Sequence, residues 1–436
     1  MVIVFLLVTV SVLVAANWYL WRRLFRDTTR APGAARRAGA ALIAGGWVLA
    51  VAALVAERTG APFWLQRTLA WPGFLWLALS IYLLLALLVG EAVRPLLRRY
   101  LERRDRATAP PAAADVRRPE PIPAGAPPRT ADPAEDGRDT EAPGSPGANS
   151  PAPEPSNPSE PSGPSRRLFV SRVVAGAAAA AAVGTVGHGS YGVLRGPRVK
   201  RVTVPLAKLP RGAHGFRIAV VSDIHLGPVL GRGFAQKVVD TINATQPDLI
   251  AVVGDLVDGS VKDLGPAAAP LAQLRARHGA YFVTGNHEYF SGAEQWVEEV
   301  RRLGLRPLEN DRTELPYFDL AGVNDVAGED EGQGPDFVKA LGDRDTARAC
   351  VLLAHQPVQI HDAVEHGVDL QLSGHTHGGQ LWPGSLLAAA ANPTVAGLER
   401  YGDTQLYVSR GAGAWGPPTR VGAPSDITVV ELASAR

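Results

Sequence analysis

The sequence predicts an α/β globular domain that is preceded by an α-helical transmembrane region. Long apolar runs without ionisable residues occupy the first part of the 436-residue chain, which is typical of membrane helices. Beyond residue 198, short apolar runs alternate with helix-like segments, which is typical of an α/β domain with a largely parallel sheet. A chain of this length fits two or three structural units.

Three apolar runs predict three transmembrane helices within residues 1–106. These runs lie at residues 2–21, 38–56 and 69–90. No basic residue precedes the first run and no small-residue cleavage site follows it, so we favour a membrane helix over a cleaved signal peptide. Because none of the runs contains an ionisable residue, we favour an anchor or a small helical bundle over a transporter.

The arginines predict the orientation of these helices. The segments after the first and the third run each hold six arginines, whereas the loop between the second and third runs holds two. Positive charge is retained on the cytoplasmic side of a membrane, so we expect both arginine-rich segments inside and the N-terminus outside.

Residues 107–165 predict a disordered, Pro-rich linker, because 16 prolines and no aromatic residue leave too little apolar surface to offset chain entropy.

Residues 166–190 begin with Arg166 and Arg167, followed by an aromatic residue and a weakly hydrophobic run, as in a twin-arginine export signal. A fourth transmembrane helix explains the same pattern. Either interpretation predicts a multi-pass protein of the cell membrane with residues 198–436 extracytoplasmic, and the first adds the twin-arginine translocase as a partner.

The domain over residues 198–436 is predicted as two sheets with helices. Strands are expected at residues 216–221, 249–253, 280–284, 317–323, 350–354, 369–372, 405–409 and 427–432. Helices are expected at residues 232–245, 266–277, 292–303 and 358–366. Because only one helix lies among the later strands, we expect those strands to form a second sheet packed on the first.

Five of the predicted strands end in clusters of Asp, Asn, Glu and His. In chain order the clusters are Asp223 with His225, Asp255 with Asp258, Asn286 with His287 and Glu288, His355 alone, and His375 with His377. Ligands of open α/β sheets bind at the carboxyl ends of strands, so we expect one site there. Alternation along an extended chain predicts that Asp223 and His225 share one side, and that His375 and His377 do the same.

The residue types indicate a metal site. Carboxylate, imidazole and amide oxygen without thiolate suit divalent Mn, Fe, Zn or Co. Seven candidate ligands are too many for one ion and suit two ions that share a carboxylate, an arrangement that serves displacement at phosphorus. Five histidines at strand ends beside Asp and Asn are not explained as ordinary buried histidines.

The net charge of +2 conceals unequal parts. Residues 1–106 carry a net +9, whereas residues 198–436 carry a net −6. Since the basic excess lies outside the globular domain, the composition predicts no nucleic-acid partner. The single cysteine, Cys350, excludes an intrachain disulfide and is expected to be a buried structural residue.

Together these motifs resemble the calcineurin-like metallophosphoesterase family, particularly its bacterial membrane-associated or exported phosphodiesterase branch. The motifs are Asp223-x-His225, Gly254-Asp255-x-x-Asp258, Gly285-Asn286-His287-Glu288, His355 and Gly374-His375-Thr376-His377, within residues 214–435. The resemblance implies a four-layer αββα sandwich of two mixed sheets over residues 198–436. Two divalent ions would make the site positive within an acidic domain, as an anionic phosphoester requires.

The resemblance also implies a role for each residue. One ion would be held by Asp223, His225 and His377, the other by Asn286, His355 and His375, with Asp255 bridging the two. A hydroxide activated by both ions would attack phosphorus, and His287 would protonate the leaving oxygen or stabilise the transition state. Asp258 and Glu288 would orient the ligands, although a plain turn carboxylate explains them equally well.

We therefore expect a membrane-anchored hydrolase of phosphoric mono- or diesters, with a diester favoured. The resemblance allows lipid or envelope substrates such as UDP-2,3-diacylglucosamine; the alternative is an inactive scaffold or sensor, which the complete ligand set disfavours. Candidates for a substrate wall are Tyr289, Phe290, Trp382 and Trp415, and Arg410 is a candidate phosphate contact. Residues 386–391 could contact lipid, although we favour ordinary loop packing.

Overall fold

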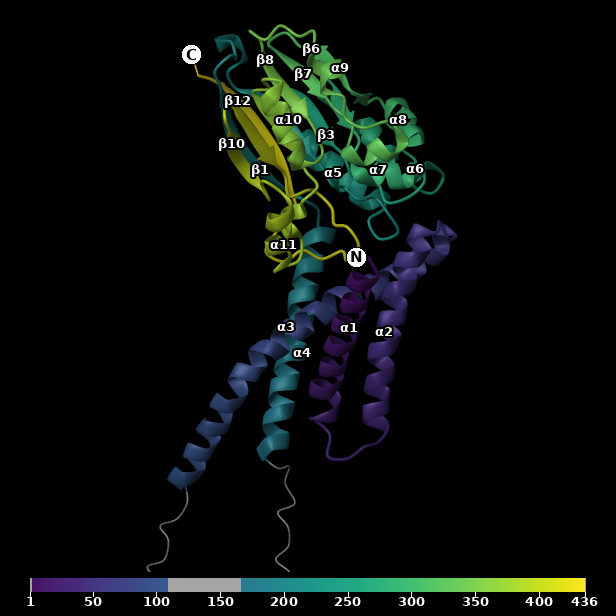
Figure 1. Ribbon diagram of the computed structural model, residues 1–436, viewed down its shortest axis with the longest axis vertical. Helices are drawn as coiled ribbons and strands as arrows, with labels where there is room; N and C mark the ends of the chain where they lie inside the picture. Colours follow the sequence, from purple (N-terminus) through teal and green to yellow (C-terminus); the bar gives the residue numbers. More distant parts are fainter. Residues whose placement is uncertain (1, 109–165, 436) are drawn as a thin grey trace, which may run out of the picture.

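The structure is a computed structural model that describes residues 2–108 and 166–435 (Figure 1). The predicted linker at 107–165 lies outside the described residues, apart from its first two. Four long helices lie side by side beneath the α/β domain in Figure 1. They are α1(Val2–Trp21), α2(Ala34–Arg58), α3(Phe63–Thr108) and α4(Arg166–Leu194), with a π-helical turn at Arg22–Arg26 after α1.

Among the described residues, three of these helices are long and apolar enough to cross a membrane. The three spans are Ala34–Arg58, Phe63–Arg104 and Arg166–Leu194. The first predicted run, 2–21, forms helix α1, and its role as a span stays a prediction. The third run is part of a 46-residue helix, because the arginine-rich segment that follows the apolar residues continues the same helix.

The α/β domain contains two six-stranded mixed sheets. The first has the order β1-β12-β2-β3-β4-β5 and the second the order β10-β11-β9-β8-β7-β6. In the first sheet β2 to β5 are parallel, and β12 joins β2 in antiparallel orientation. In the second, β7, β8, β9 and β11 are parallel, with β6 and β10 as antiparallel edges.

The strand bounds follow the predicted pattern closely. The first sheet consists of β1(Arg198–Leu206), β2(Phe216–Val221), β3(Leu249–Val253), β4(Ala280–Val283), β5(Arg306–Pro307) and β12(Asp426–Ser434). The second consists of β6(Asp311–Glu314), β7(Phe318–Gly322), β8(Ala349–Leu353), β9(Leu370–Ser373), β10(Gly397–Tyr401) and β11(Thr404–Val408). The helices are α5(Arg232–Ala244), α6(Val261–Ala268), α7(Asn286–Ser291), α8(Ala293–Arg302), α9(Phe337–Leu341), α10(Ile360–Glu365) and α11(Gly384–Ala391).

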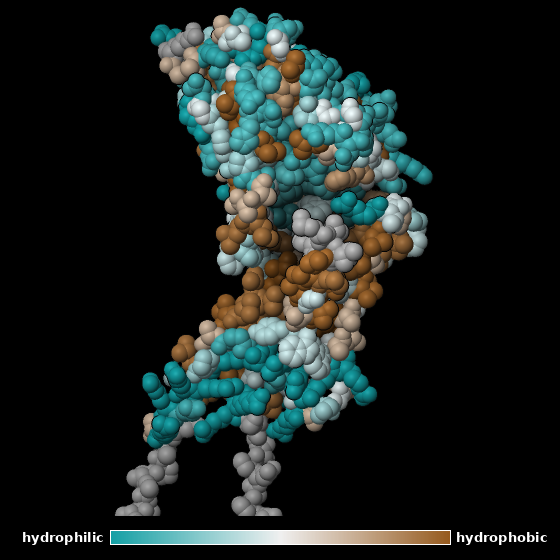
Figure 2. Space-filling view, viewed as in Figure 1, coloured by the Kyte–Doolittle hydropathy of each residue, from teal (hydrophilic) through white to brown (hydrophobic). Residues whose placement is uncertain are grey.

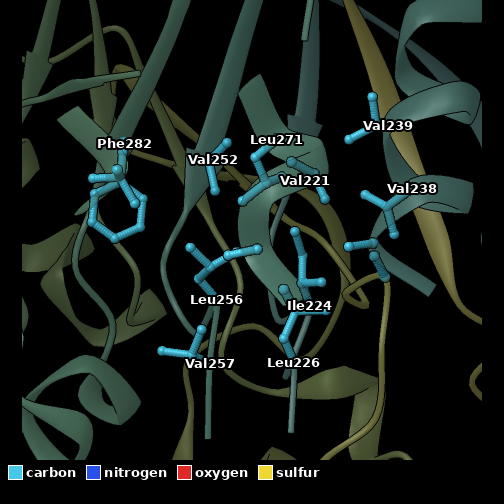
Figure 3. Close-up of a cluster of buried hydrophobic side chains, with 14 of the residues drawn as sticks. Val221, Ile224, Leu226, Val238, Val239, Val252, Leu256, Val257, Leu271 and Phe282 are labelled. Atoms are coloured by element: carbon cyan, nitrogen blue, oxygen red, sulfur yellow. The ribbon is translucent and has the colours of Figure 1, made fainter. Parts of the chain in front are cut away.

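Three apolar clusters define four layers. Alternate residues of β2 divide between two of them: Ile218 faces the second sheet, whereas Ala219 faces α5 and α8. Figure 3 shows the cluster between the first sheet and its helices, which includes Val252 and Phe282 of the strands and Val238 of α5. A third cluster packs α9 and α10 on the outer face of the second sheet.

Helices, two sheets and helices thus form the predicted αββα sandwich. Burial of both strand faces explains why the strands read as continuous apolar runs. Cys350 lies fully buried on β8 and is free, as expected. Burial raises the pKa of its thiol to about 12, so the thiol is unreactive near neutral pH.

One predicted helix, 266–277, is wrong in its bounds. The helix begins at Val261 because the hydroxyl of Ser260 accepts a hydrogen bond from the backbone N–H of Asp263, which caps the first turn. From Ala269 to Gln273 it continues as a 3₁₀ helix. The edge strands β1, β5, β6 and β10 and the short helices α7, α9 and α11 have no counterpart in the prediction, because such short or edge elements carry weak periodicity.

The long helices α3 and α4 are in direct contact with the α/β domain. The hydroxyl of Tyr82 on α3 donates to the carbonyl of Trp382 at 3.1 Å. Near the end of α4, the hydroxyls of Ser190 and Thr419 lie 2.7 Å apart, and α4 is separated from β1 by only three residues. Phe63, the first residue of α3, packs against the core of the first sheet.

Candidate active site

The five polar clusters converge at one edge shared by the two sheets. In the first sheet, β2, β3 and β4 are parallel neighbours, so the segments after them lie side by side. In the second sheet β8 and β9 are parallel neighbours, and His355 and the segment at 374–377 follow them directly. All seven predicted metal ligands therefore lie at this edge.

A first group of ligand atoms comes from Asp223, His225, Asp255 and His377, which lie within 4.8 Å of one another. The Nε2 atoms of His225 and His377 are 3.0 Å apart, and His377 Nε2 is 3.4 Å from an oxygen of Asp223. His225 Nε2 is 3.7 Å from Asp255 Oδ2. Asp223, His225 and His377, which were predicted to hold one ion, thus lie together with Asp255, the predicted bridging ligand.

A second group consists of Asp255, His355 and His375. His355 Nε2 lies 3.1 Å from Asp255 Oδ2, and its other nitrogen is 2.9 Å from the carbonyl of Val253. The Oδ1 atom of Asn286 lies 3.0 Å from His375 Nδ1, which places the amide beside this group. Asp255 belongs to both groups, as a bridging ligand must.

The backbone at the site adopts strained conformations. Asp223, His225, Asp255, His375 and His377 all have positive φ angles, between 48° and 72°. Such angles are rare for residues other than glycine and cluster at functional sites. Left-handed backbone, and not alternation, therefore directs these side chains: Asp223 and His225 share a ligand group as expected, whereas His375 and His377 belong to different groups.

His287 lies beside the first group and shares Asp258 with His225. Its Nδ1 is 2.7 Å from Asp258 Oδ1, and His225 Nδ1 is 2.8 Å from the same oxygen. Although burial alone would lower the pKa of His287, the hydrogen bond and charge of Asp258 raise it to about 9. The two imidazoles lower the pKa of Asp258 to about 2 despite its burial.

Glu288 connects two of the loops that carry ligands. Its carboxylate accepts hydrogen bonds from the backbone N–H groups of Gly285, Asp255 and Leu256, at 2.6 to 3.0 Å. The side chain is fully buried. A Cβ on Gly285 would collide with the carboxylate of Asp255, so this close approach of the loops requires glycine. Glu288 and Asp258 both touch ligand residues, which suits an orienting role.

The donor set fits divalent cations. Asp223 Oδ2 is buried without a hydrogen-bond partner, and the buried His355 Nε2 faces Asp255 Oδ2 at 3.1 Å; each atom belongs to a ligand group. Burial raises the pKa of Asp223, whereas the charge of His355 overcomes burial and holds the pKa of Asp255 well below its usual range. Buried carboxylates that lack donors are costly unless a cation neutralises them. Two ions of charge 2+ would satisfy these atoms.

Several further residues support or surround the site. Arg420, which no motif indicated, donates from its buried guanidinium to the carbonyls of His377, Gly413 and Ala423, and its Nη2 lies 3.0 Å from His377 Nδ1. Asp325, also without a motif signal, is buried and accepts a hydrogen bond from Gln356, next to His355. Neither could be recognised from sequence, because both reach the site through loops with irregular spacing.

Only some of the aromatic residues predicted to line the substrate lie at the site. The rings of Phe290 and Trp415 lie 5.5 and 5.7 Å from the His287 ring. Tyr289 is turned inward instead: it is buried, and its hydroxyl donates to the carbonyl of Gln333. Arg410 packs against Gly378, next to His377 in the chain, and its contact with phosphate stays a prediction.

Comparison with known proteins agrees with this geometry. Residues 216–379 match the family model for calcineurin-like phosphoesterases. A transmembrane protein with metallophosphoesterase domain from Danio rerio is 39% identical over 263 residues, 57% of this chain and 60% of the relative. An uncharacterized metallophosphoesterase of Helicobacter pylori is 39% identical over 247 residues, 56% of this chain and 66% of the relative. The chain thus spans less than two thirds of the length of these two relatives.

A third relative is matched over most of its length. An uncharacterized metallophosphoesterase of Aquifex aeolicus is 35% identical over 240 residues, 54% of this chain and 91% of the relative. Among solved structures, a dimetal phosphatase from Danio rerio has a TM-score of 0.34 at 12% identity, covering 50% of this chain and 93% of that one. The chain belongs to the calcineurin-like metallophosphoesterase family, as the sequence motifs predicted.

We predict that Glu288→Gln weakens both the fold and the metal centre. The amide would direct N–H groups at backbone donors, so unfolding should become easier by about 1–3 kcal/mol. Because Asp255 would lose its fixed position, metal affinity should fall about 10- to 100-fold. Thermal melting and metal analysis of the purified chain measure both effects. The exposed Glu298→Gln is the control, and a Glu288→Gln protein that matches it would contradict the proposed role.

Proposed function

We propose that this protein is a membrane-anchored, metal-dependent phosphoesterase with a preference for phosphodiesters. The observation that carries the proposal is the pair of ligand groups joined by Asp255, in which Asp223 Oδ2 is buried without a hydrogen-bond partner. Two bound divalent ions would supply the positive charge that lowers the pKa of a water molecule and offsets the charge on the phosphoester oxygens. The seven residues of the two groups, including Asn286, would hold them.

The reaction that we propose is an in-line hydrolysis. The oxygen of water forms a bond to phosphorus, the bond from phosphorus to the leaving oxygen breaks, and a proton passes to that oxygen. His287 would donate this proton, because Asp258 holds its Nδ1 at 2.7 Å and raises the pKa of the imidazole. The shared hydrogen bonds of Asp258 also fix the orientation of His225 relative to His287.

We infer that the chain is a multi-pass membrane protein with its catalytic domain outside the cytoplasm. The three candidate membrane spans support a membrane location, and so does the transmembrane relative from Danio rerio. The arginine distribution supports the orientation. The twin-arginine translocase as a partner rests on the motif at Arg166 and Arg167, and an envelope substrate, of which UDP-2,3-diacylglucosamine is an example, rests on the sequence resemblance.

Removing a central ligand should abolish hydrolysis. We expect Asp255→Asn and His355→Ala to lower the hydrolysis of bis(p-nitrophenyl) phosphate at least about 100- to 1,000-fold, because each removes charge stabilisation at the reacting phosphate. Chelation of the wild-type chain should have the same effect, with recovery on adding Mn²⁺ or Zn²⁺. His361→Ala, outside both ligand groups, is the control. Full activity of both ligand variants would refute a metal-dependent reaction and favour a scaffold.

His287→Asn should affect substrates according to their leaving groups. A p-nitrophenolate leaves readily without a proton, whereas an alkoxide does not, so loss of an acid penalises alkyl esters more. We expect a loss of about 100- to 10,000-fold for an alkyl phosphodiester and a clearly smaller loss for the p-nitrophenyl ester. Equal losses for both substrates would show that His287 stabilises charge instead of donating a proton.

Reporter fusions should reveal the orientation. Alkaline phosphatase is active only outside the bacterial cytoplasm, so a fusion after residue 436 should be active and a fusion after residue 106 inactive. Export that fails in cells without the twin-arginine translocase, or after replacing Arg166 and Arg167 with lysine, would identify the route. An active fusion after residue 106 would overturn the orientation derived from the arginines.

A further inference from the structure

The membrane helices reach the mouth of the candidate active site. The guanidinium of Arg58, the last residue of α2, lies 4.9 Å from the centre of the Phe290 ring. That ring lies 5.5 Å from the ring of His287. The carboxylate of Glu57 lies within electrostatic range of Asp258, His287 and His225. The tip of the α2–α3 hairpin is therefore next to the proposed proton donor.

This hairpin tip is held in place by packing. Phe63, the first residue of α3, packs against the core of the first sheet. Val229 of the loop before α5 packs between α2 and α3, against Ala53 and Phe74. The side chain of Arg58 is exposed, and its charge interacts with the neighbouring Glu57 without a direct ion pair among the residues that the structure describes. A cation is thus fixed at the mouth with its charge available to an anion.

The other side of the mouth carries an unusual apolar helix. Helix α11 begins seven residues after His377 and has no buried residue. Its Leu386 and Leu387 are 69% and 78% exposed. Figure 2 shows that the apolar surface of this helix continues into the apolar belt of the membrane helices. Such a helix, with leucines facing outward beside a membrane bundle, is typical of a segment that lies in the membrane interface.

The base of α11 is anchored to the bundle. Leu381 packs against the buried residues of the membrane helices, and the carbonyl of Trp382 accepts the hydrogen bond from Tyr82 on α3. The Trp382 side chain is 54% exposed and Trp415, beside His287, is 44% exposed. Exposed tryptophans and leucines at this level match the boundary between headgroups and acyl chains. The expected loop packing of residues 386–391 is therefore wrong, because no residue of α11 is buried.

We propose that the α2–α3 tip and α11 form the two sides of a substrate entrance that lies at the membrane surface. The substrate, on this inference, is a lipid phosphoester of the extracytoplasmic leaflet. Its phosphate would enter between Phe290 and Trp415, Arg58 would bind an anionic oxygen of the headgroup, and Leu386 and Leu387 would contact the acyl chains. This inference rests on the proposed phosphodiesterase function and makes the membrane region part of substrate recognition.

The test compares two substrates that release the same product. One is the p-nitrophenyl ester of dioleoyl phosphatidic acid, embedded in nanodiscs with the full chain. The other is bis(p-nitrophenyl) phosphate, which is soluble in water. We expect the wild-type chain to have a kcat/KM at least tenfold higher for the lipid. Comparable values for the two substrates, or hydrolysis of the soluble one alone, would overturn the inference and leave the phosphodiesterase function intact.

The variants then identify the entrance. Arg58→Gln should lower the ratio of lipid to soluble kcat/KM about tenfold, the value of one charge-assisted contact, and Arg58→Lys should restore most of it. The double variant Leu386→Glu with Leu387→Glu should lower the same ratio. Arg67→Gln, on α3 and exposed, and Val338→Glu on α9 are the controls and should leave it unchanged. A ratio that none of the entrance variants changes would refute these roles.

The possible failures can be told apart. If the wild-type chain with Mn²⁺ or Zn²⁺ hydrolyses neither substrate, the proposed function itself is wrong and the entrance falls with it. If both are hydrolysed and the ratio responds to Leu386→Glu with Leu387→Glu but not to Arg58→Gln, the lipid entrance stands and the headgroup contact is refuted. Thermal melting and metal content of each variant show whether the α/β domain has kept its fold.

Discussion

The shared carboxylate of Asp255 is the constraint on which the site depends. One of its oxygens faces His225 and His355, and the other accepts the backbone N–H of His287. These partners follow three different strands in two sheets. The strand order places β3 between β2 and β4, and the contact of His355 Nδ1 with the carbonyl of Val253 brings the end of β8 to the end of β3. A sandwich of two sheets with parallel centres brings these strand ends to a common edge.

The arrangement has a substantial energetic cost, and the surrounding structure offsets it. Buried charges and left-handed backbone at Asp223, His225 and Asp255 each disfavour the folded state. Backbone groups compensate in part: the N–H of His375 donates to Asp223, and three N–H groups donate to Glu288. The atoms that these bonds leave without donors are the ones that divalent cations would neutralise. Metal binding and stability of the α/β domain are therefore coupled.

Sequence reasoning predicted the centre of the fold and site better than their periphery. Strands buried on both faces are continuous apolar runs, and a ligand that follows such a strand is recognised by its position. The motifs therefore indicated all seven candidate ligands, even though the alternation argument for their directions was wrong. Arg420 and Arg58 gave no signal, because their distance to His377 or Phe290 is decided by tertiary packing and not by spacing along the chain. Tertiary packing also determines that the side chain of Tyr289 points inward, which spacing along the chain does not predict.

The apolar helices illustrate how one sequence feature can serve two purposes. Absence of ionisable residues within the spans argued for a plain anchor, and that argument still disfavours transport. That argument considered only the interior of the spans and not the residues at their polar ends. Arg58 is the last residue of α2, and the packing of Phe63 holds the adjoining start of α3 against the α/β domain. An anchor that only restricts diffusion needs no such contact. Because the hairpin tip and α11 approach the site from two sides, the proposed membrane region would determine which phosphoesters reach the ligand groups, in addition to where hydrolysis takes place.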